Sequence, residues 1–444
     1  MNPKHELKAI LVDCIPPGTT KEEAEHRLTE AESLIKTYGG LVVIKKIQKR
    51  QTPDYRTFIG SGKLEEIIAE SKSLDANILI INNELKPHQT FNINERLRQE
   101  AEKEKKSATD PAVKGKIHKE LREPLQAWDR IDVILKIFQK HATTREARLE
   151  IELASIKHMG PRIFGMGMQL SRQGGGIGTR GSGETNIEAM KRHLSKMEFR
   201  IKQELDACKK VRKVHRDGRK RLELKTVGII GYTNAGKSTL LNSLTKKGAY
   251  AADKLFATLD TRVGKMFIEN INKEVLVSDT IGFIENLPTT LIQSFQSTLE
   301  ESIEADILLH VIDISDPRFL QKIEVVNEIL FQIESLMKPT IYVFNKIDRL
   351  PAEQRAQFES DDMTGDNLIL PNRAQLKERF GVFHPVFVSA ERKEGLAELK
   401  KTLGEALFPH PSAPSATGVL DVIQQLKQTR QLRNFVQKKR EQQP

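Results

Sequence analysis

Apolar and polar residues follow one another along the first hundred residues in blocks that predict alternating strands and helices. Short apolar runs at Ala9–Val12, Leu41–Ile44 and Ile78–Ile81 predict strands. Amphipathic stretches at Lys21–Tyr38 and about Lys63–Lys72 lie between them and predict helices. This strand–helix alternation favours a small parallel α/β domain.

The middle of the chain has a helical pattern that glycine interrupts. Residues 95–124 are polar and charged, which indicates an exposed helix or a flexible linker. One helical pattern runs from Leu125 to Met159, and another repeats apolar residues at steps of three and four from Ile187 to Val211. The six glycines in Arg172–Gly183 oppose regular structure. We therefore expect two antiparallel helices with a glycine-rich loop at or near one end.

The second half of the chain returns to the strand–helix rhythm. Five apolar runs predict strands there: Thr226–Ile230, Glu274–Ser278, Ile307–Asp313, Thr340–Phe344 and Pro385–Ala390. Polar residues follow directly after these runs. Such residues at the carboxyl ends of parallel strands are typical of a ligand site.

The first of these strands leads into GYTNAGKS, Gly231 to Ser238, and then into an amphipathic run that predicts a helix. This strand, glycine loop and helix form the context of a P-loop, in which backbone N–H groups and the helix dipole bind phosphate. Lys237 would reach the β- and γ-phosphates, and the Ser238 hydroxyl would bind Mg²⁺. A plain glycine turn is the alternative, but it gives no role to the lysine and serine.

Three further motifs occupy the later strand ends in the order that a GTPase requires. In Asp279-Thr280-Ile281-Gly282, the acid suits a partner of Mg²⁺ and the Gly282 N–H can meet a γ-phosphate. In Asn345-Lys346-Ile347-Asp348, the last carboxylate can accept two hydrogen bonds from guanine, a donor pattern that adenine lacks. Asn345 would tether the loop, the Lys346 stem would cover the base, and the Ala390 N–H after Ser389 would approach guanine O6.

A threonine between the P-loop helix and Asp279 should bind Mg²⁺ only when the γ-phosphate is present. Thr258 and Thr261 compete for this role, and Thr258 is preferred because FATL resembles the switch of bacterial translation-factor-class GTPases. Phe283 follows Gly282 where many GTPases carry a water-orienting glutamine. Intrinsic hydrolysis should therefore be slow, and a partner should order the attacking water.

The expected site combines catalytic residues, Mg²⁺ ligands and GTP-binding residues. The catalytic residues are Lys237, Thr258 and Gly282, and the Mg²⁺ ligands are Ser238 and Thr258. The GTP-binding residues are Gly231, Tyr232, Thr233, Asn234, Ala235, Gly236, Lys237, Ser238, Phe256, Ala257, Thr258, Leu259, Asp260, Asp279, Thr280, Ile281, Gly282, Asn345, Lys346, Ile347, Asp348, Ser389 and Ala390.

The excess of basic residues predicts a polyanionic partner. Lys and Arg number 71 against 60 Asp and Glu, and basic residues gather in Lys209–Arg221. An ordinary solvated helix face is the alternative to nucleic-acid binding. The glycine-rich loop is either a disordered connection or a segment whose small residues let backbone and arginines approach phosphates. The candidate RNA contacts are Arg172, Gly174, Gly175, Gly176, Arg180, Lys209, Lys210, Arg212 and Lys213.

Composition bounds the cellular setting. The two cysteines, Cys14 and Cys208, cannot form a disulfide framework, which favours a reducing cytoplasm. The N-terminus has no signal-peptide apolar region, and no apolar run approaches a membrane span. Phe58–Lys63 reads FIGSGK, a weak pattern that indicates a plain strand-to-helix turn more than a second phosphate site.

With these motifs in view, the chain resembles the HflX family of ribosome-associated GTPases over about Phe58 to Ala390. The specific matches are FIGSGKLEEI, NNELKPHQ, TREARLEIELA, LSRQGGGIGTRGSGET, GYTNAGKSTLLNSLT, LFATLD, DTIGFIENLP, HVIDISDP and NKID. Departures are Ser182, where the family usually has proline, a shorter connection after FATLD, and the polar insert at about 99–123.

The resemblance implies a GTPase that binds the large ribosomal subunit, splits stalled ribosomes under stress, and hydrolyses GTP once docked. Some members of the family also hydrolyse ATP through the N-terminal domain. One alternative is a GTPase that acts in ribosome assembly or RNA maturation. The other is an RNA-binding scaffold in which the nucleotide only regulates docking. We expect a cytoplasmic monomer that uses Mg²⁺.

The expected fold class is multidomain α/β. We expect an α/β domain at 1–105, a helical hairpin with a glycine-rich tip and linker at 106–224, a P-loop GTPase domain with a mostly parallel sheet and helices on both faces at 225–408, and a linker with a basic tail at 409–444.

Overall fold

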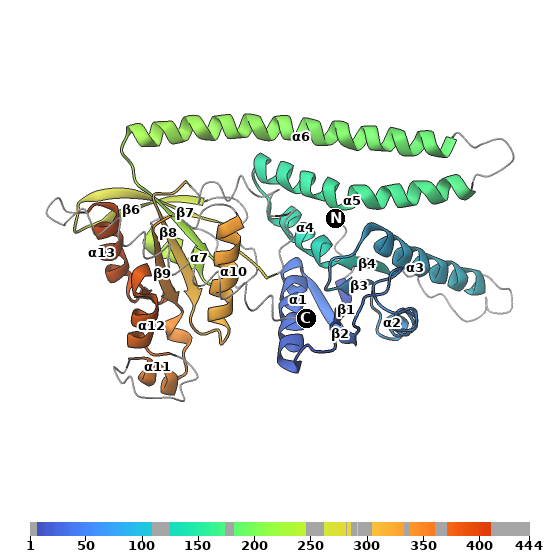
Figure 1. Cartoon of the computed structure of the whole chain (residues 1–444), viewed down its shortest axis with the longest axis horizontal. Coiled ribbons are helices and arrows are strands. Elements are labelled where there is room, and N and C mark those ends of the chain that lie inside the picture. The colour runs from blue at the N-terminus through green and yellow to red at the C-terminus, as the bar shows by residue number, and fades with distance from the viewer. Residues whose placement is uncertain are drawn as a thin grey trace. The chain divides into compact units, whose positions relative to one another are not determined.

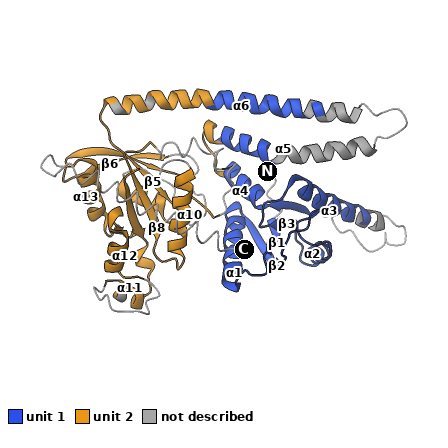
Figure 2. Ribbon diagram, in the orientation of Figure 1, with its two compact units in different colours: residues 1–140, 148–205 blue, residues 141–147, 206–444 orange. Residues whose placement is uncertain are grey.

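The computed structural model describes residues 7–108, 125–173, 182–245, 262–280, 282–285, 291, 304–332, 338–359 and 371–409. These residues fall into two compact units, one of residues 1–140 and 148–205 and the other of residues 141–147 and 206–444 (Figure 2). The hairpin helices are divided between these units. The predicted four-part division stays a prediction.

The first unit contains a four-stranded, entirely parallel sheet in the order β2-β1-β3-β4, with four covering or connecting helices (Figure 1). The predicted parallel α/β domain is thereby confirmed. Its elements are β1 Leu7–Ile15, α1 Lys21–Tyr38, β2 Gly40–Lys49, α2 Ser61–Ser73, β3 Ile78–Ile81, α3 Pro87–Ala108, β4 Gln126–Asp129 and α4 Arg130–His141.

The start of the middle region differs from the prediction. Helical structure was expected from Leu125, but Gln126–Asp129 form β4, which pairs with β3, and helix α4 begins only at Arg130. The Asp132 N–H donates to Asp129 Oδ1 at 2.8 Å and the Asp129 N–H donates to Asp132 Oδ2 at 3.0 Å. This reciprocal cap fixes the helix start. The strand depends on non-local pairing, which periodicity cannot reveal.

Two long helices form the predicted hairpin: α5, Arg145–Gln173, and α6, Ser182–Arg221. Within the first unit, Leu149 and Leu153 of α5 pack with Ile201 and Leu205 of α6 in a buried cluster. This confirms the predicted apolar stripe on the second helix, at i and i+4 positions of one face. The connection 174–181 lies outside the described residues.

The second unit contains a six-stranded sheet in the order β10-β9-β8-β5-β7-β6, parallel except for the edge pair β6–β7 (Figure 1). β6 was not predicted. Its alternating burial suits an edge strand with one solvent-facing side. The elements are β5 Thr226–Gly231, α7 Lys237–Leu244, β6 Arg262–Ile268, β7 Lys273–Asp279, β8 Ile307–Asp313, α10 Phe319–Gln332, β9 Thr340–Asn345, η1 Ile347–Arg349, α11 Ala352–Glu359, α12 Arg373–Phe380, η2 Gly381–Phe383, β10 Val386–Phe387 and α13 Leu396–Leu407.

Two apolar clusters position this sheet. One joins β5, β7, β8 and β9 to α7 and α13, and includes Val227, Leu240 and Leu399. The other packs aromatic residues of β9 and α12 together, with Tyr342 stacked on Phe383 at 4.2 Å between ring centroids. With helices on both faces, the sheet presents the carboxyl ends of its parallel strands at one edge. No helix within the described ranges is long and apolar enough to cross a membrane.

Candidate GTP site and basic helix

The P-loop leaves the carboxyl end of β5 at Gly231 and enters α7 at Lys237. Gly236 has a φ of 94°, and a Cβ added there would lie 2.2 Å from Asn345 Nδ2. Glycine is therefore required at this turn, both for its left-handed backbone and for the close approach of Asn345. The N-cap residue Gly236 makes no side-chain hydrogen bond to the first N–H groups of α7, which form a candidate phosphate site.

Lys237 is 6% exposed, and its ammonium group donates a hydrogen bond to the carbonyl oxygen of Tyr232 at 2.8 Å. Burial lowers its pKa to about 8, Asp279 opposes this shift, and Lys346 adds to it. A buried ammonium group without phosphate nearby is costly. The lysine is thus placed to gain free energy when phosphate oxygens enter the loop.

Ser238 and Asp279 face one another across the strand ends. The Ser238 hydroxyl donates to Asp279 Oδ2 at 2.7 Å, and Asp279 is completely buried. A hydroxyl oxygen oriented by a carboxylate is the hard-oxygen donor set that Mg²⁺ prefers. These residues therefore fit a Mg²⁺ ion, with Ser238 as its ligand and Asp279 as the group that orients it. Thr258, the other predicted ligand, lies outside the described residues.

Gly282 lies against the P-loop. A Cβ at Gly282 would lie 2.7 Å from Lys237 Nζ and 2.8 Å from Thr233 Cγ2. The next residue, Phe283, is 2% exposed. Its N–H donates to the carbonyl oxygen of Gly231 at 3.1 Å, and its own carbonyl oxygen accepts from the Thr233 N–H at 2.7 Å. The Phe283 ring is thus part of the core, and this position offers no polar side chain to an attacking water.

Asn345 connects three predicted motifs. Its Nδ2 donates to the carbonyl oxygen of Ala235 at 2.9 Å, and its Oδ1 accepts from the Ala390 N–H at 3.0 Å. The Ala390 N–H, which we expect to face guanine O6, is engaged by Asn345 in this structure. Ser389 is completely buried, and its hydroxyl accepts from the Arg392 N–H at 3.1 Å.

The Lys346 side chain crosses the P-loop, where its ammonium group donates to the carbonyl oxygen of Asn234 at 2.7 Å. The same group pairs with Asp313 at 2.7 Å. Asp348 lies in η1, is half-buried, and forms no hydrogen bond or ion pair with the rest of the described chain. Its carboxylate is therefore available to a ligand, as the guanine assignment requires.

Three residues that contribute to the site were not predicted: Asp313, Glu285 and Ser243. Asp313, at the carboxyl end of β8, holds Lys346. The Tyr232 hydroxyl accepts from the Glu285 N–H at 2.9 Å, and the Ser243 hydroxyl donates to the Ala390 carbonyl oxygen at 2.6 Å. Only Asp313 had a sequence indication, because it ends an apolar strand as the other motif acids do.

The remaining predicted GTP-binding residues lie outside the description: Phe256, Ala257, Thr258, Leu259, Asp260 and Ile281. Among the candidate RNA contacts, Gly174, Gly175, Gly176, Arg180 and the Arg172 side chain are also outside it.

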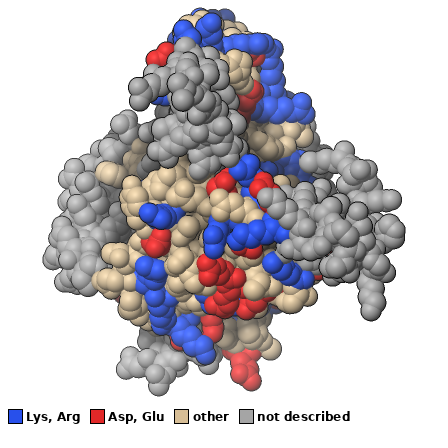
Figure 3. Space-filling model, turned by 90° about the vertical axis from the view of Figure 1, so that its right-hand side faces the viewer, with Lys and Arg blue, Asp and Glu red and all other residues tan. Residues whose placement is uncertain are grey.

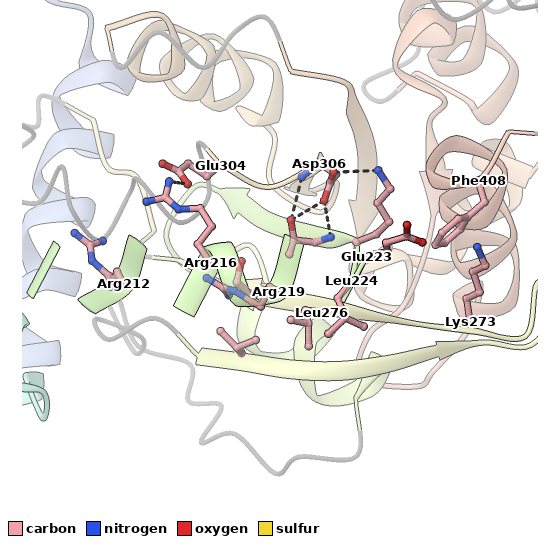
Figure 4. Close-up of a pocket in the computed structure, with 14 residues that line it drawn as sticks. Arg212, Arg216, Arg219, Glu223, Leu224, Lys273, Leu276, Glu304, Asp306 and Phe408 are labelled. Atoms are coloured by element: carbon pink, nitrogen blue, oxygen red, sulfur yellow. Dashed lines mark hydrogen bonds and ion pairs between the residues drawn. The ribbon is translucent and has the colours of Figure 1, made fainter. Parts of the chain in front are cut away.

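The basic run of α6 has two distinct faces. Lys209, Lys210 and Lys213 are exposed. Arg212 is half-buried and pairs with Glu146 at 3.1 Å, and Arg216 pairs with Glu304 (Figure 4). The run is therefore only partly a solvated face. Figure 3 views the molecule from the opposite end, where Lys and Arg side chains predominate near the top and acidic and basic side chains are interspersed below.

Three family models match the chain. They are described as GTP-binding GTPase N-terminal at residues 25–101, GTP-binding GTPase Middle Region at 141–219, and 50S ribosome-binding GTPase at 226–346. A solved GTP-binding protein from Sulfolobus solfataricus in complex with GDP is 22% identical, with a TM-score of 0.43, over 90% of this chain and 98% of that one.

Curated relatives match most of the chain. The GTPase HflX of Caldanaerobacter subterraneus subsp. tengcongensis is 37% identical over 90% of this chain and 81% of its own length. That of Alkalihalophilus pseudofirmus is 40% identical over 77% and 74%, and that of Escherichia coli is 35% identical over 87% and 80%. Together with the P-loop, DTIG and NKID geometry, these matches show that the chain is a GTP-hydrolysing enzyme and belongs to the HflX family of GTPases.

Proposed function

We propose that this GTPase binds the large ribosomal subunit in the cytoplasm and splits or remodels stalled ribosomes, with GTP hydrolysis stimulated on docking. The observation that carries the proposal is the burial of Phe283. Its ring is 2% exposed beside Gly282, so this position cannot orient water. A docked partner would supply or order the missing group.

The nucleotide site would work through residues that the fold brings together. Lys237 and the N–H groups of α7 would bind the phosphates, while Ser238 and Thr258 would hold Mg²⁺, which screens charge on the β- and γ-oxygens. Gly282 would sense the γ-phosphate, because its backbone lies against Lys237. Asp348 would select guanine. GTP loading would thus be linked to the segment that follows Gly282.

Ribosomal RNA would be contacted by the exposed side of α6 and by the glycine-rich connection. Lys209, Lys210 and Lys213 are exposed and would neutralise phosphates. Arg212 is half-buried against Glu146, so its contribution to RNA binding would be smaller. Arg172, Arg180 and the glycines at 174–176 would form the tip that enters RNA. The family-model description as a 50S ribosome-binding GTPase supports this partner.

Turnover measurements test the proposal directly. GTP hydrolysis should rise at least tenfold when purified large subunits are added, because a partner that completes a GTPase site can accelerate hydrolysis by about 10³–10⁵-fold. Light scattering should then show that intact ribosomes dissociate with GTP but not with GDP. Turnover that large subunits leave unchanged would favour a nucleotide-regulated scaffold. Stimulation only by immature particles would favour a role in ribosome assembly.

A further inference from the structure

The second unit holds a cavity at the edge of its sheet opposite the P-loop. It has a volume of about 470 Å³ and lies beneath the last turns of α6, beside Thr226 at the start of β5 (Figure 4). The P-loop follows the other end of the same strand, after Gly231. The cavity is therefore separate from the candidate GTP site.

Three arginines of α6 face this cavity. Arg212, Arg216 and Arg219 are spaced by four and three residues, so they share one side of the helix. Lys225 and Lys273 add two more cations to the lining. Figure 4 shows Arg212 at one end of the cavity and Lys273 with Phe408 at the other.

Acidic residues neutralise only part of this charge. Arg216 pairs with Glu304, Lys225 pairs with Asp306 at 3.3 Å, and Arg212 pairs with Glu146. Asp306 also accepts from the Thr226 N–H and hydroxyl, both at 2.8 Å. Neither Arg219 nor Lys273 forms an ion pair with another described residue. The carboxylate of Glu223 also lines the cavity and forms no ion pair with another described residue, so the cations without ion pairs exceed such carboxylates by one.

The floor between these cations is apolar. Leu224, Val263, Leu276 and Phe408 contribute to the lining, and Lys273 Nζ lies 4.4 Å from the centroid of the Phe408 ring. A planar, weakly polar group can pack on such a floor while its attached anion meets arginine. The planar guanidinium group favours a phosphate, which it can bind in a bidentate way.

We propose that this cavity is a second anion site, which binds the phosphate of a nucleotide or of a nucleotide chain with Arg219 as its principal ligand. The base lies against Leu276 and Phe408, and Lys273 flanks it. The nearby exposed lysines of α6 extend the positive surface along which a strand can run. The site does not depend on the proposed ribosomal function, because its occupant can be measured on the protein alone.

Calorimetry on the full chain, saturated with GDP and Mg²⁺, tests this site. GDP occupies the candidate guanine site. The nucleotide probes contain adenine because the candidate guanine site should not bind this base. The probes are AMP, a 5′-phosphorylated adenylate trinucleotide and inorganic phosphate. Arg219→Gln should weaken nucleotide binding by about tenfold or more, the range for losing a charge-assisted hydrogen bond. Arg221→Gln, exposed on the same helix, is the matched control and should leave affinity unchanged.

Comparing the probes shows whether the bound phosphate belongs to a free nucleotide or to an RNA strand. A trinucleotide that binds more tightly than AMP, with dependence on Arg219, supports an RNA strand, and equal affinities support a free nucleotide. Unchanged GDP affinity and hydrolysis in Arg219→Gln would show that the variant is folded. The proposal is overturned if Arg219→Gln binds the probes like wild type, if no probe binds, or if hexaglutamate binds more tightly at this site.

Discussion

At the scale of single residues, Asn345 joins the segments that would form the proposed guanine pocket. Its amide reaches the P-loop through Ala235 and the last strand end through Ala390. One side chain thus holds three segments that are distant in sequence. Asp348, three residues later, stays without a described partner. The residue that holds these segments together, Asn345, is therefore distinct from Asp348, the residue proposed to recognise the base.

Asp348→Asn should change the preferred base. The amide replaces one acceptor by a donor, so guanine loses a hydrogen bond and xanthine, with an added carbonyl, gains one. An unpaired buried polar group costs about 1–3 kcal/mol, so GDP affinity should fall about tenfold or more and XDP affinity should rise. Calorimetry with both nucleotides measures this, with exposed Glu353→Gln as the control. Retained guanine preference would remove Asp348 from the base pocket.

The pKa of Lys237 predicts proton uptake on nucleotide binding. In the nucleotide-free protein burial lowers this pKa to about 8, whereas phosphates in the loop favour the charged ammonium and raise it. At pH 8.5 a group with a pKa of about 8 is roughly three-quarters deprotonated, so binding should take up roughly three-quarters of a proton. Calorimetric heats of GDP binding should therefore differ between buffers of unlike ionisation enthalpy. Equal heats would contradict the buried, shifted lysine.

Without nucleotide the same shift affects stability, and its sign follows from linkage. The folded pKa lies below the unfolded value of 10.5, so the penalty for burying the charge is complete below about pH 8. It disappears as pH rises from 8 towards 10.5, where the folded lysine is neutral and the unfolded one still charged. Lys237 therefore destabilises the empty protein most near neutral pH.

At the scale of elements, α6 serves two environments. Its middle packs on α5 through Ile201 and Leu205, and its last turns carry arginines that line the cavity of the second unit. A long, basic helix is thus anchored by apolar contacts at one part and by ion pairs at another. The exposed lysines between these anchors are held at fixed spacing.

Ile201→Ala should loosen the hairpin locally. Ile201 is 4% exposed within a small cluster of four buried side chains, so its truncation leaves a cavity that few neighbours can fill. The loss should be about 2 kcal/mol. Hydrogen exchange should show reduced protection around residue 201, with GDP affinity unchanged. Phe199→Ala, on the same helix but 64% exposed, should leave protection unaltered; equal effects of both variants would contradict the packing.

Neutralising the exposed lysines should flatten the salt dependence of ribosome binding. Changing Lys209, Lys210 and Lys213 to glutamine should reduce the slope of log affinity against log salt by about 2–3, if each meets one phosphate. Arg212→Gln should alter it less, because Arg212 pairs with Glu146. Sedimentation at several salt concentrations measures the slope. The control variant changes Lys21, Lys393 and Lys401, which are also exposed, to glutamine. If the two triple variants have the same salt slope, the lysines of α6 form an ordinary solvated helix face and do not contact RNA.

At the scale of the whole molecule, the candidate GTP site and the proposed RNA contacts lie in different segments. The GTP site is built from strand ends of the second unit, whereas the glycine-rich connection lies between α5 and α6. A change in the glycine-rich connection should therefore leave GTP affinity intact. This separation makes a two-way test possible.

Replacing Gly174, Gly175 and Gly176 by leucine should keep GTP affinity and abolish ribosome splitting in light scattering. Bulky side chains would prevent the backbone from approaching RNA. Lys237→Ala should instead lose nucleotide binding. If the glycine variant splits ribosomes at the normal rate, the tip is only a connector.

The motifs of the GTP site were predictable from the sequence because each is local. GYTNAGKS, DTIG and NKID place their residues at strand ends within a few positions, and periodicity gave β3, β8 and α1 with correct bounds. The alternation of strand and helix also predicted the parallel sheet of the first unit and the mostly parallel sheet of the second. Local patterns were sufficient here because backbone geometry and burial act over neighbouring residues.

Tertiary structure decided what depends on partners distant in sequence. β4 and β6 exist through pairing with β3 and β7, the inward turn of Arg212 and Arg216 depends on Glu146 and Glu304, and Asp313 becomes a site residue only by meeting Lys346. The cavity beneath α6 likewise joins residues from 212 to 408. Such contacts form only when the chain folds back on itself. The order of residues along the chain does not show which charged side chains will then face one another.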